Sequence, residues 1–286
     1  MVTVLAPAKI NLGLEIIGRR ADGYHDIRSI LIPVSLFDRV TVGPARVSSI
    51  WTNDSSLDAH DNLALRAAAA LAIPLRIEIH KRIPLAAGLG GASSDAAAVL
   101  NAAWMLELEP GLDRLHAIGR SLGADVPFFL ESGAVLASGR GDEFSAIAQA
   151  RLGWFVVAIP CIEIPSKTAT LYAALTPGDF SDGSVIELLA AAISSGRTST
   201  SAAIGNAFER PLYDGWPAAR QVRDAMIAAG AAAVGLSGAG PAHYAICDDF
   251  RAAAALAAAT RKRVNRETRV VVCRPLTEPM PHRFVH

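Results

Sequence analysis

The chain of 286 residues has 27 basic and 27 acidic side chains, and 51% of its residues are hydrophobic. This length accommodates about two domains with sizeable cores, and the balanced charge gives no reason to expect a nucleic-acid or membrane partner. Three widely spaced cysteines argue against a zinc site or a disulfide framework, and no signal peptide is visible, so we expect a soluble cytoplasmic protein.

The first predicted element is a strand over residues 8–17. Every second residue is aliphatic, so the residues between them, which include Lys9 and Asn11, face the other way. Such a strand could deliver both polar side chains to one site, although a single lysine on a strand face is usually solvated. The turn-rich segment that follows carries Tyr24 and His25, which could equally close a small core or stay exposed in a loop.

The rest of the first half alternates strands and helices. We expect two strands within 29–42, a helix through 66–71 capped by residues 61–63, a strand at 75–80, and helices at 96–108 and 112–122. Asp125 then follows as the only charge in an apolar neighbourhood. A carboxylate there is costly without partners, so Asp125 is either a structural cap or a working acid.

The pattern restarts near residue 153 with a buried strand at 154–159. We place a domain boundary there and divide the chain into 1–152 and 153–286. Further helices are expected at 169–175, 185–193, 218–229 and 251–262, with strands at 243–247 and 268–273. Because strands and helices are mixed in both halves, the predicted fold class is α+β.

The most informative stretch is a glycine-rich loop between the strand at 75–80 and the alanine-rich helix. Three glycines close together remove side chains where a backbone must approach something closely. The serines and the aspartate after them lie where helix N-caps are preferred, and free N–H groups before a helix form an anion site. The loop reads Pro84, Leu85, Ala86, Ala87, Gly88, Leu89, Gly90, Gly91, Ala92, Ser93, Ser94 and then Asp95.

Two familiar nucleotide motifs do not fit this loop. A Walker A loop needs Lys after its last glycine, but Gly91 is followed by Ala92. A dinucleotide fingerprint needs a third glycine where Ser93 stands, and an acidic residue about 20 positions later that closes a second strand. That region falls inside a predicted helix instead. From the glycines alone, a tight turn or helix cap without any ligand stays open.

The P-x-x-x-G-L-G-x-x-S-S form of the loop resembles the phosphate-binding loop of the GHMP kinase superfamily, which includes galactokinase and the homoserine and mevalonate kinases. Two further motifs of this superfamily are matched in order, at 7–12 and at 236–241. The flanking residues resemble the branch of the family that acts on a cytidylylated methylerythritol. These flanking matches lie at 20–25, 61–63, 123–127 and 206–209.

This resemblance implies a fold and a reaction. The N-terminal half would be like domain 2 of ribosomal protein S5, the C-terminal half ferredoxin-like, and the active site would lie in the cleft between them. The expected reaction is ATP-dependent phosphorylation of the 2-hydroxyl of the cytidylylated substrate, in non-mevalonate isoprenoid synthesis. Mg²⁺ would accompany ATP, but its ligands stay unknown because it commonly keeps its waters and rides on the phosphates. The oligomeric state is left open.

The resemblance also implies roles for single residues. Asp125 matches the base that accepts the hydroxyl proton, and Lys9 matches the cation that pairs with this carboxylate and the transferring oxygens. Whether Lys9 activates the hydroxyl or orients Asp125 is undecided. Residues 84–94 would hold the ATP phosphates, and Asn62 and Lys81 match positions near the adenine. The substrate-binding positions are Asn11, Tyr24, His25, Gly238 and Gly240, of which Tyr24 and His25 would hold cytosine.

Departures from the family pattern are small, and three rival functions can be weighed. Ala92 stands where many members have glycine. Ala239 stands where Ser or Thr is usual, which puts a side-chain contact to phosphate in doubt. Tyr24 and His25 argue against a homoserine or mevalonate kinase. A non-catalytic sensor should lack Lys9 or Asp125, and an NAD-binding dehydrogenase should carry the missing fingerprint.

Overall fold

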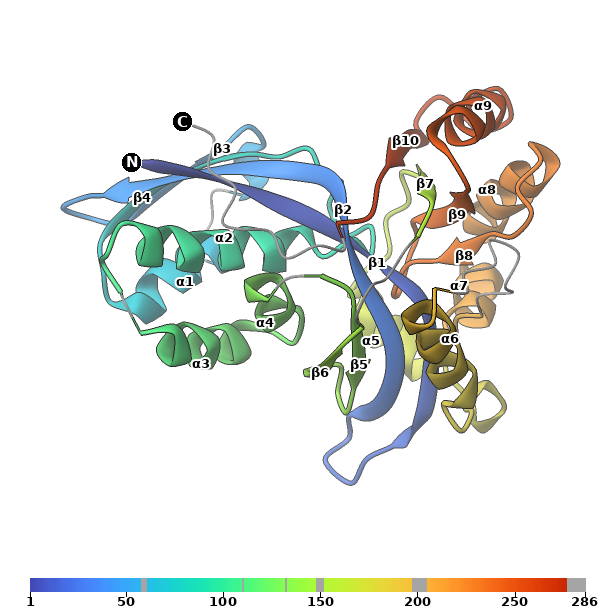
Figure 1. Cartoon of the computed structure of the whole chain (residues 1–286), viewed down its shortest axis with the longest axis horizontal. Coiled ribbons are helices and arrows are strands. Elements are labelled where there is room, and N and C mark those ends of the chain that lie inside the picture. The colour runs from blue at the N-terminus through green and yellow to red at the C-terminus, as the bar shows by residue number, and fades with distance from the viewer. Residues whose placement is uncertain (58–60, 110, 132, 148–151, 197–204, 277–286) are drawn as a thin grey trace.

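The computed structural model describes residues 1–57, 61–109, 111–131, 133–147, 152–196 and 205–276. Its strands form two sheets, and a long hairpin of the first sheet runs through both parts of the molecule (Figure 1). The first sheet has the order β3-β4-β2-β5-β6, with β1 paired to β2. Its strands are β1 (Val2–Arg19), β2 (His25–Pro44), β3 (Ser49–Thr52), β4 (Leu75–His80), β5 (Val135–Ser138) and β6 (Glu143–Ala146).

The β1–β2 hairpin is longer than the sequence predicted. We expected two strands within 29–42, and this was wrong, because β2 is one strand of 20 residues. Its pairing with β1 jumps at one point: Pro7 faces Phe37 while Ala8 faces Val34, so two extra residues fall into an irregularity of the ladder. A bulge of this kind bends a strand without ending it, and the antiparallel partner β1 keeps the ladder continuous on both sides. The bend lies next to Lys9.

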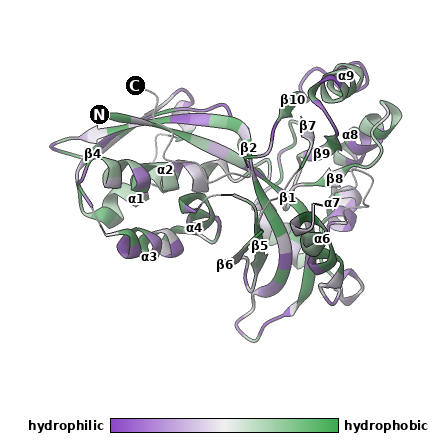
Figure 2. Ribbon diagram, viewed as in Figure 1, coloured by the Kyte–Doolittle hydropathy of each residue, from purple (hydrophilic) through white to green (hydrophobic). Residues whose placement is uncertain are grey.

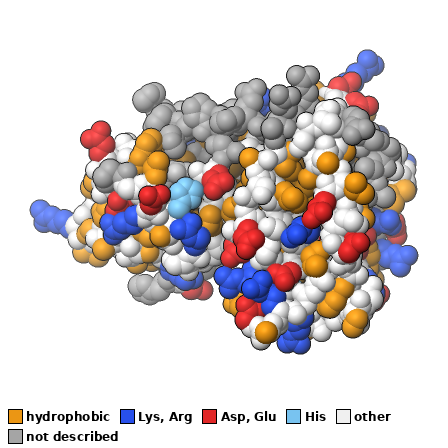
Figure 3. All heavy atoms as spheres, turned by 60° about the horizontal axis from the view of Figure 1, so that its bottom comes forward, with side chains coloured by type: hydrophobic (Ala, Val, Ile, Leu, Met, Phe, Trp, Pro, Cys, Tyr) orange, Lys and Arg blue, Asp and Glu red, His pale blue; other side chains and the backbone are white. Residues whose placement is uncertain are grey.

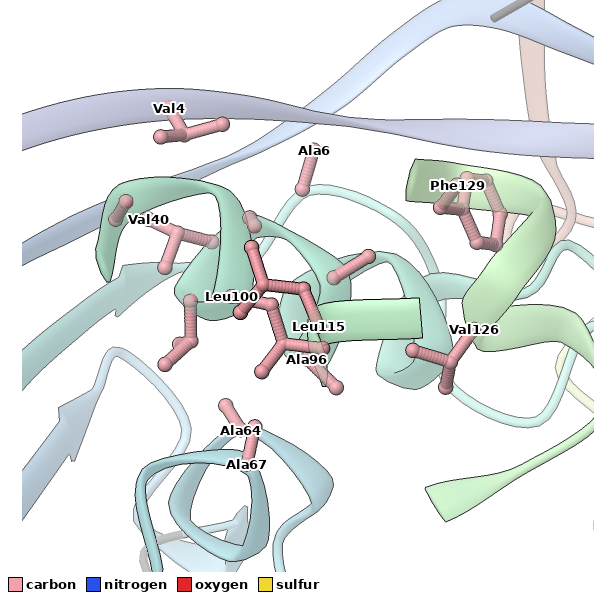
Figure 4. Packing of buried hydrophobic residues seen from close by; sticks show 14 of the residues in the cluster. Val4, Ala6, Val40, Ala64, Ala67, Ala96, Leu100, Leu115, Val126 and Phe129 are labelled. Atoms are coloured by element: carbon pink, nitrogen blue, oxygen red, sulfur yellow. The ribbon is translucent and has the colours of Figure 1, made fainter. Parts of the chain in front are cut away.

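The helices of the first half cover one face of this sheet. They are α1 (Leu63–Leu71), α2 (Gly91–Met105), α3 (Leu112–Leu122) and α4 (Asp125–Leu130). Helix α2 lies in the middle, between the strands and α1, and alanines such as Ala64, Ala67 and Ala96 let the elements approach closely (Figure 4). Larger residues such as Leu100 fill the remaining space, and fully burying each contributes about 1.5–3 kcal/mol. The alanine-rich sequence is therefore a packing feature.

Helix α2 begins earlier than expected. Its N-cap is Gly90, whose φ of 72° turns the chain directly into the helix, and Ser94 N–H donates the first helical bond to Gly90 O at 3.0 Å. Ser93, Ser94 and Asp95 therefore lie within the helix, and their prediction as N-cap residues was wrong. The cap expected within 61–63 is confirmed, and it is Asn62, whose side chain accepts from Ala64 N–H.

The second sheet has the order β10-β7-β9-β8. Helices α8 and α9 pack on one of its faces, while Phe155 and Val157 of β7 share a core cluster with Ile10 and Ile32 of the hairpin. The elements are β7 (Trp154–Ile159), α5 (Lys167–Ala173), α6 (Ser184–Ser194), α7 (Glu209–Gly215), α8 (Pro217–Ala228), β8 (Gly235–Leu236), β9 (His243–Cys247), α9 (Phe250–Arg261) and β10 (Arg269–Cys273).

Hydropathy follows this arrangement. Hydrophobic residues run along much of β1 and β2, whereas the surface helix α3 alternates between hydrophobic and hydrophilic residues (Figure 2). Acidic and basic side chains are interspersed on the face that Figure 3 shows. Among the described residues, no helix is long and apolar enough to cross a membrane.

The predicted division after residue 152 falls between the last strand of the first sheet and β7. Residues 148–151 lie outside the described ones, and the division stays a prediction.

Candidate active site

Two glycine segments interlock at the centre of the site. A Cβ at Gly88 would lie 2.2 Å from Ser237 O, so only glycine allows this approach. Ser237 Oγ donates to Gly88 O at 3.0 Å, and Ala242 N–H donates to Ala87 O at 3.1 Å. The predicted phosphate loop is thus tied to the second glycine turn, about 150 residues away in sequence, by these hydrogen bonds and by a close approach that a side chain at Gly88 would block.

The glycine loop encloses a cavity of about 180 Å³ in front of helix α2. Backbone N–H groups at the start of α2 face an anion there favourably, because the helix dipole adds to their hydrogen bonds. All the predicted loop residues except Ser94 line this cavity. The lining consists of Lys81, Ile83, Pro84, Leu85, Ala86, Ala87, Gly88, Leu89, Gly90, Gly91, Ala92 and Ser93.

A second, larger cavity of about 330 Å³ adjoins the first and shares Gly88, Gly90 and Ser93 with it. Its polar lining comes from elements far apart in the chain: β1, α4, the β5–β6 turn, α5 and the second glycine turn. A ligand in the loop cavity could therefore reach groups in the larger one. The chemically relevant lining residues are Lys9, Asn11, Asp125, Arg140, Lys167, Tyr172 and Gly238.

Lys9 and Asp125 meet in this larger cavity. Lys9 Nζ lies 3.7 Å from Asp125 Oδ2 and donates to Asn11 Oδ1, while Asn11 Nδ2 donates to Ser29 Oγ at 2.8 Å. The Lys9 side chain is 7% exposed but that of Asp125 is 35% exposed, so the carboxylate is the accessible member of the pair. The structure brings together the residues predicted as cation and base, and their roles in catalysis stay predictions.

Gly238 also belongs to this group, whereas Gly240 does not line either of these two cavities. A Cβ at Gly238 would lie 2.9 Å from Asn11 Oδ1 and 3.3 Å from Lys9 Nζ. Glycine is therefore needed at position 238 so that the turn can approach Lys9 and Asn11. Gly240 contributes its carbonyl oxygen, which accepts from Lys167 Nζ.

Tyr24 and His25 lie at the rim of the larger cavity, since each contacts a residue that lines it. The His25 ring stacks on Tyr172 with centroids 4.8 Å apart, and the Arg140 guanidinium lies 5.0 Å from the centroid of the Tyr24 ring. Both partners line the cavity. Tyr24 is 58% exposed, so its ring is free to cover a ligand. Burial and the nearby Asp125 raise the pKa of Tyr172 to about 12, and its phenol therefore stays neutral.

Lys81 and Asn62, both predicted near adenine, differ in where they lie. Asn62 caps α1, donates to Leu57 O at 2.8 Å and is not in the lining of the loop cavity. Lys81 lines that cavity, but its Nζ lies 2.6 Å from Asp95 Oδ2 and also contacts Asp38. Burial opposes the Lys81 charge, yet the two carboxylates raise its pKa overall.

Comparisons with known proteins match this geometry. The family model for the GHMP kinases N terminal domain matches residues 62–133, and that for the GHMP kinases C terminal matches residues 188–266. The chain belongs to the GHMP kinases. It is 37% identical over 259 residues to a 4-diphosphocytidyl-2-C-methyl-D-erythritol kinase of Dehalococcoides mccartyi, covering 87% of this chain and 90% of the relative. A kinase of the same name from Salinibacter ruber is 40% identical over 264 residues, covering 87% and 91%.

Solved structures agree with this membership. A crystal structure of 4-(cytidine 5'-diphospho)-2C-methyl-D-erythritol kinase has a TM-score of 0.78 and 35% identity, covering 95% of this chain and 98% of that one. A homoserine kinase from Cytophaga hutchinsonii has a TM-score of 0.71 at 20% identity and covers 99% and 97%, which shows a shared fold. The predicted α+β GHMP kinase fold is confirmed, and the chain is a small-molecule kinase that uses ATP.

Sequence reasoning missed several residues of this GHMP kinase site. Asn206 Nδ2 donates to Leu236 O at 2.9 Å and Gly238 O at 2.8 Å, which fixes the second glycine turn. Arg140 and Lys167 line the larger cavity, and no sequence motif predicted either of them. One signal was available: the chain has only four lysines, and three of them line the two cavities.

Proposed function

We propose that the chain transfers the terminal phosphoryl group of ATP to the 2-hydroxyl of 4-diphosphocytidyl-2-C-methyl-D-erythritol. The observation that carries this is the pair of adjoining cavities, with Lys9 and Asp125 where the glycine loop opens into the larger one. The relatives that bear this activity in their names match nearly the full chain. The reaction would serve non-mevalonate isoprenoid precursor synthesis in the cytoplasm.

In this proposal ATP lies along the glycine loop. Residues 84–94 offer backbone N–H groups and the N-terminus of α2 to the phosphates, which suits a polyanion. Lys81 lines the loop cavity and Asn62 starts α1, so the adenine would lie toward that end. The terminal phosphoryl group would then point at the larger cavity.

Asp125 is the acceptor of the hydroxyl proton. A tertiary hydroxyl is a weak nucleophile, and its oxygen attacks phosphorus more readily as its proton passes to a carboxylate. The bond from the terminal phosphorus to the bridging oxygen of ADP breaks as the new phosphorus–oxygen bond forms. Lys9, 3.7 Å from Asp125, pairs with the carboxylate and stabilises the charge that develops on the transferring oxygens.

The other end of the substrate is the cytidyl group. Tyr24 presents an exposed ring, and His25 is fixed by its stack on Tyr172, so a cytosine could stack on one and be read at its edge by the other. Asn11, held by Lys9 and Ser29, and the turn at Gly238 and Gly240 would contact the methylerythritol.

Mg²⁺ is expected with ATP, and the residues present fit it in a limited way. The described residues contain no group of three or more His, Cys, Asp or Glu side chains suited to a metal ion. Ser94 Oγ and Asp95 Oδ1 are buried without hydrogen-bond partners on the first turns of α2, but neither residue lines the two cavities, so we assign no side-chain ligand to a Mg²⁺ that rides on the phosphates. The metal would neutralise charge on the phosphate oxygens.

The test is ADP release from ATP and Mg²⁺ with 4-diphosphocytidyl-2-C-methyl-D-erythritol, run beside homoserine and mevalonate. We expect turnover with the cytidylylated substrate alone. Turnover with either of the other acceptors would contradict the substrate assignment. ATP binding without turnover on any of the three would favour an acceptor outside this set or a sensor.

A further inference from the structure

Lys167 bridges the two glycine segments. It is the first residue of α5, and its Nζ donates to Ala86 O at 2.5 Å and also to Gly240 O. Ala86 belongs to the loop that would hold the ATP phosphates, and Gly240 to the turn from the other half of the chain. The ammonium group therefore lies where the two segments meet, and it lines the larger cavity together with Lys9.

The charge of Lys167 has no carboxylate partner among the described ion pairs. Within the same lining, Lys9 is paired with Asp125, and Arg140 lies 3.1 Å from Asp142. Two neutral carbonyl oxygens accept hydrogen bonds from Lys167 but cannot cancel its charge. A half-buried cation without a counter-ion is costly, so an anion that enters this cavity would be favoured beside Lys167.

The position of Lys167 suits one part of ATP, the phosphate that would reach the larger cavity from the glycine loop. Lys167 contacts the loop at Ala86 and lines the larger cavity, and the nearby positive charge of Lys9 helps to lower the pKa of Lys167. A hydroxyl at position 239 is missing because Ala239 stands there, so the turn itself supplies no side-chain donor at that point. Lys167 supplies an ammonium beside the same turn.

We propose that Lys167 binds the terminal phosphoryl group of ATP, exchanging its two carbonyl partners for phosphate oxygens. This inference rests on the proposed function only in taking ATP as the nucleotide. Lys167 keeps its protons during the transfer and stabilises negative charge on the equatorial oxygens, while the hydroxyl proton goes to Asp125. Lys9 lines the same cavity, so that two cations would hold the group as it moves.

The first test compares ATP with ADP by titration calorimetry in the absence of any acceptor. Lys167→Met should weaken ATP binding about 10- to 100-fold, as expected for the loss of a charged hydrogen bond, and should change ADP binding little. Lys262→Met is the matched control, because Lys262 is the remaining lysine of the chain and lies exposed after α9. Unchanged ATP affinity in Lys167→Met, or an equal loss for ATP and ADP, would overturn the proposal.

The second test uses proton uptake. Burial and the nearby Lys9 lower the pKa of Lys167 to about 8, and a bound phosphate should raise it again. Near pH 8 the free enzyme should therefore take up as much as about half a proton per ATP bound. The terminal phosphate, with its pKa of about 6, is already ionised there. Calorimetry in two buffers of different ionisation enthalpy measures this uptake.

Lys167→Arg separates binding from structure. An arginine keeps the charge but does not titrate, so ATP should still bind while the proton uptake disappears. Proton uptake that persists in Lys167→Arg belongs to another group and would refute the proposal. The Arg variant decides the matter even where Lys167→Met does not fold.

These outcomes are distinguishable from a failure of the proposed function. If Lys167→Met loses ATP affinity selectively but the unmodified enzyme ignores the cytidylylated substrate, the acceptor assignment fails and the role of Lys167 stands. If the enzyme turns over that substrate and Lys167→Met binds ATP normally, the acceptor assignment stands and the role of Lys167 fails.

Discussion

Two lysines beside the glycine loop have opposite electrostatic surroundings. Lys81, at the entry to the loop, contacts two buried carboxylates, Asp38 and Asp95, which together raise its pKa. Lys167, beside the middle of the loop, contacts only carbonyl oxygens, and burial with Lys9 lowers its pKa to about 8. One cation is fully compensated within the protein, and the other is left for a ligand.

The difference indicates which end is rigid and which end reacts. Asp38 also accepts from Ile83 N–H at 2.8 Å, so the Lys81 cluster pins the backbone that enters the loop. A compensated cluster gives a fixed frame but little net attraction for an anion. The end with excess positive charge lies beside Asp125, where the transferring phosphoryl group would accumulate contacts. Four predictions examine this contrast.

The largest effect is expected at the reactive end. Asp125→Asn removes the proton acceptor and should lower kcat by about 100- to 10,000-fold, with nucleotide affinity nearly unchanged. Steady-state kinetics and calorimetry measure the two quantities. Asp113→Asn is the control, because Asp113 also lies in the first turn of a helix but is exposed. Strongly impaired ATP binding in Asp125→Asn would count against its role as base.

The rigid end should respond in stability. Lys81→Met leaves Asp38 and Asp95 buried without their cation and should lower the free energy of unfolding by about 3–5 kcal/mol. Lys167→Met removes a cation whose pKa is lowered in the folded protein, so at pH 7 it should not lower that free energy. Urea denaturation of the two variants, with Lys262→Met beside them, gives the comparison. Equal losses for both would erase the distinction between the two ends.

At the rim of the reactive end, Tyr24→Ala should weaken binding of the cytidylylated substrate by about 1–3 kcal/mol, the range for a base that loses a stacking partner. ATP affinity should not follow, since Tyr24 lies by Arg140 and away from the glycine loop. Calorimetry with each ligand separates the two effects. Trp51→Ala, another exposed aromatic, serves as the control. Parallel losses for both ligands would contradict the cytosine assignment.

The last effect is a pH dependence of stability. The pKa of Lys167 is about 8 in the folded protein and near 10.5 when the chain is unfolded, so the unfolded state binds more protons between these values. The unmodified protein should therefore gain stability relative to Lys167→Met as the pH rises from about 8 toward 10.5, and the difference should be constant below pH 8. Urea titrations on both sides of pH 8 check this. A difference in stability that does not vary with pH would show that folding does not lower the pKa of Lys167.

Local sequence predicted much of the fold. The strands expected at 75–80, 154–159 and 243–247 coincide with β4, β7 and β9, and the helix at 112–122 coincides with α3. These elements have a regular apolar period and clear ends, such as Gly123 after α3. The hairpin strand β2 was misread as two, because the extra residues between Val34 and Phe37 break the alternation. Only pairing with β1 shows that the strand continues.

The site shows the same division. The local sequence determined the glycine loop, because its residue types lie at spacings that a short loop before a helix imposes. The pairing of Lys9 with Asp125 was predicted through motif resemblance alone, since the two residues are far apart in the chain. The sequence could not reveal the place of Lys167, the hydrogen bonds of Asn206 or the Asp38–Lys81–Asp95 cluster. Each of these depends on contacts between segments at least 14 positions apart, such as Lys167 with Ala86 across 81 positions. Which lysine is neutralised and which stays charged was decided by the tertiary structure, since burial and neighbouring charges set that balance and neither is written in the local sequence.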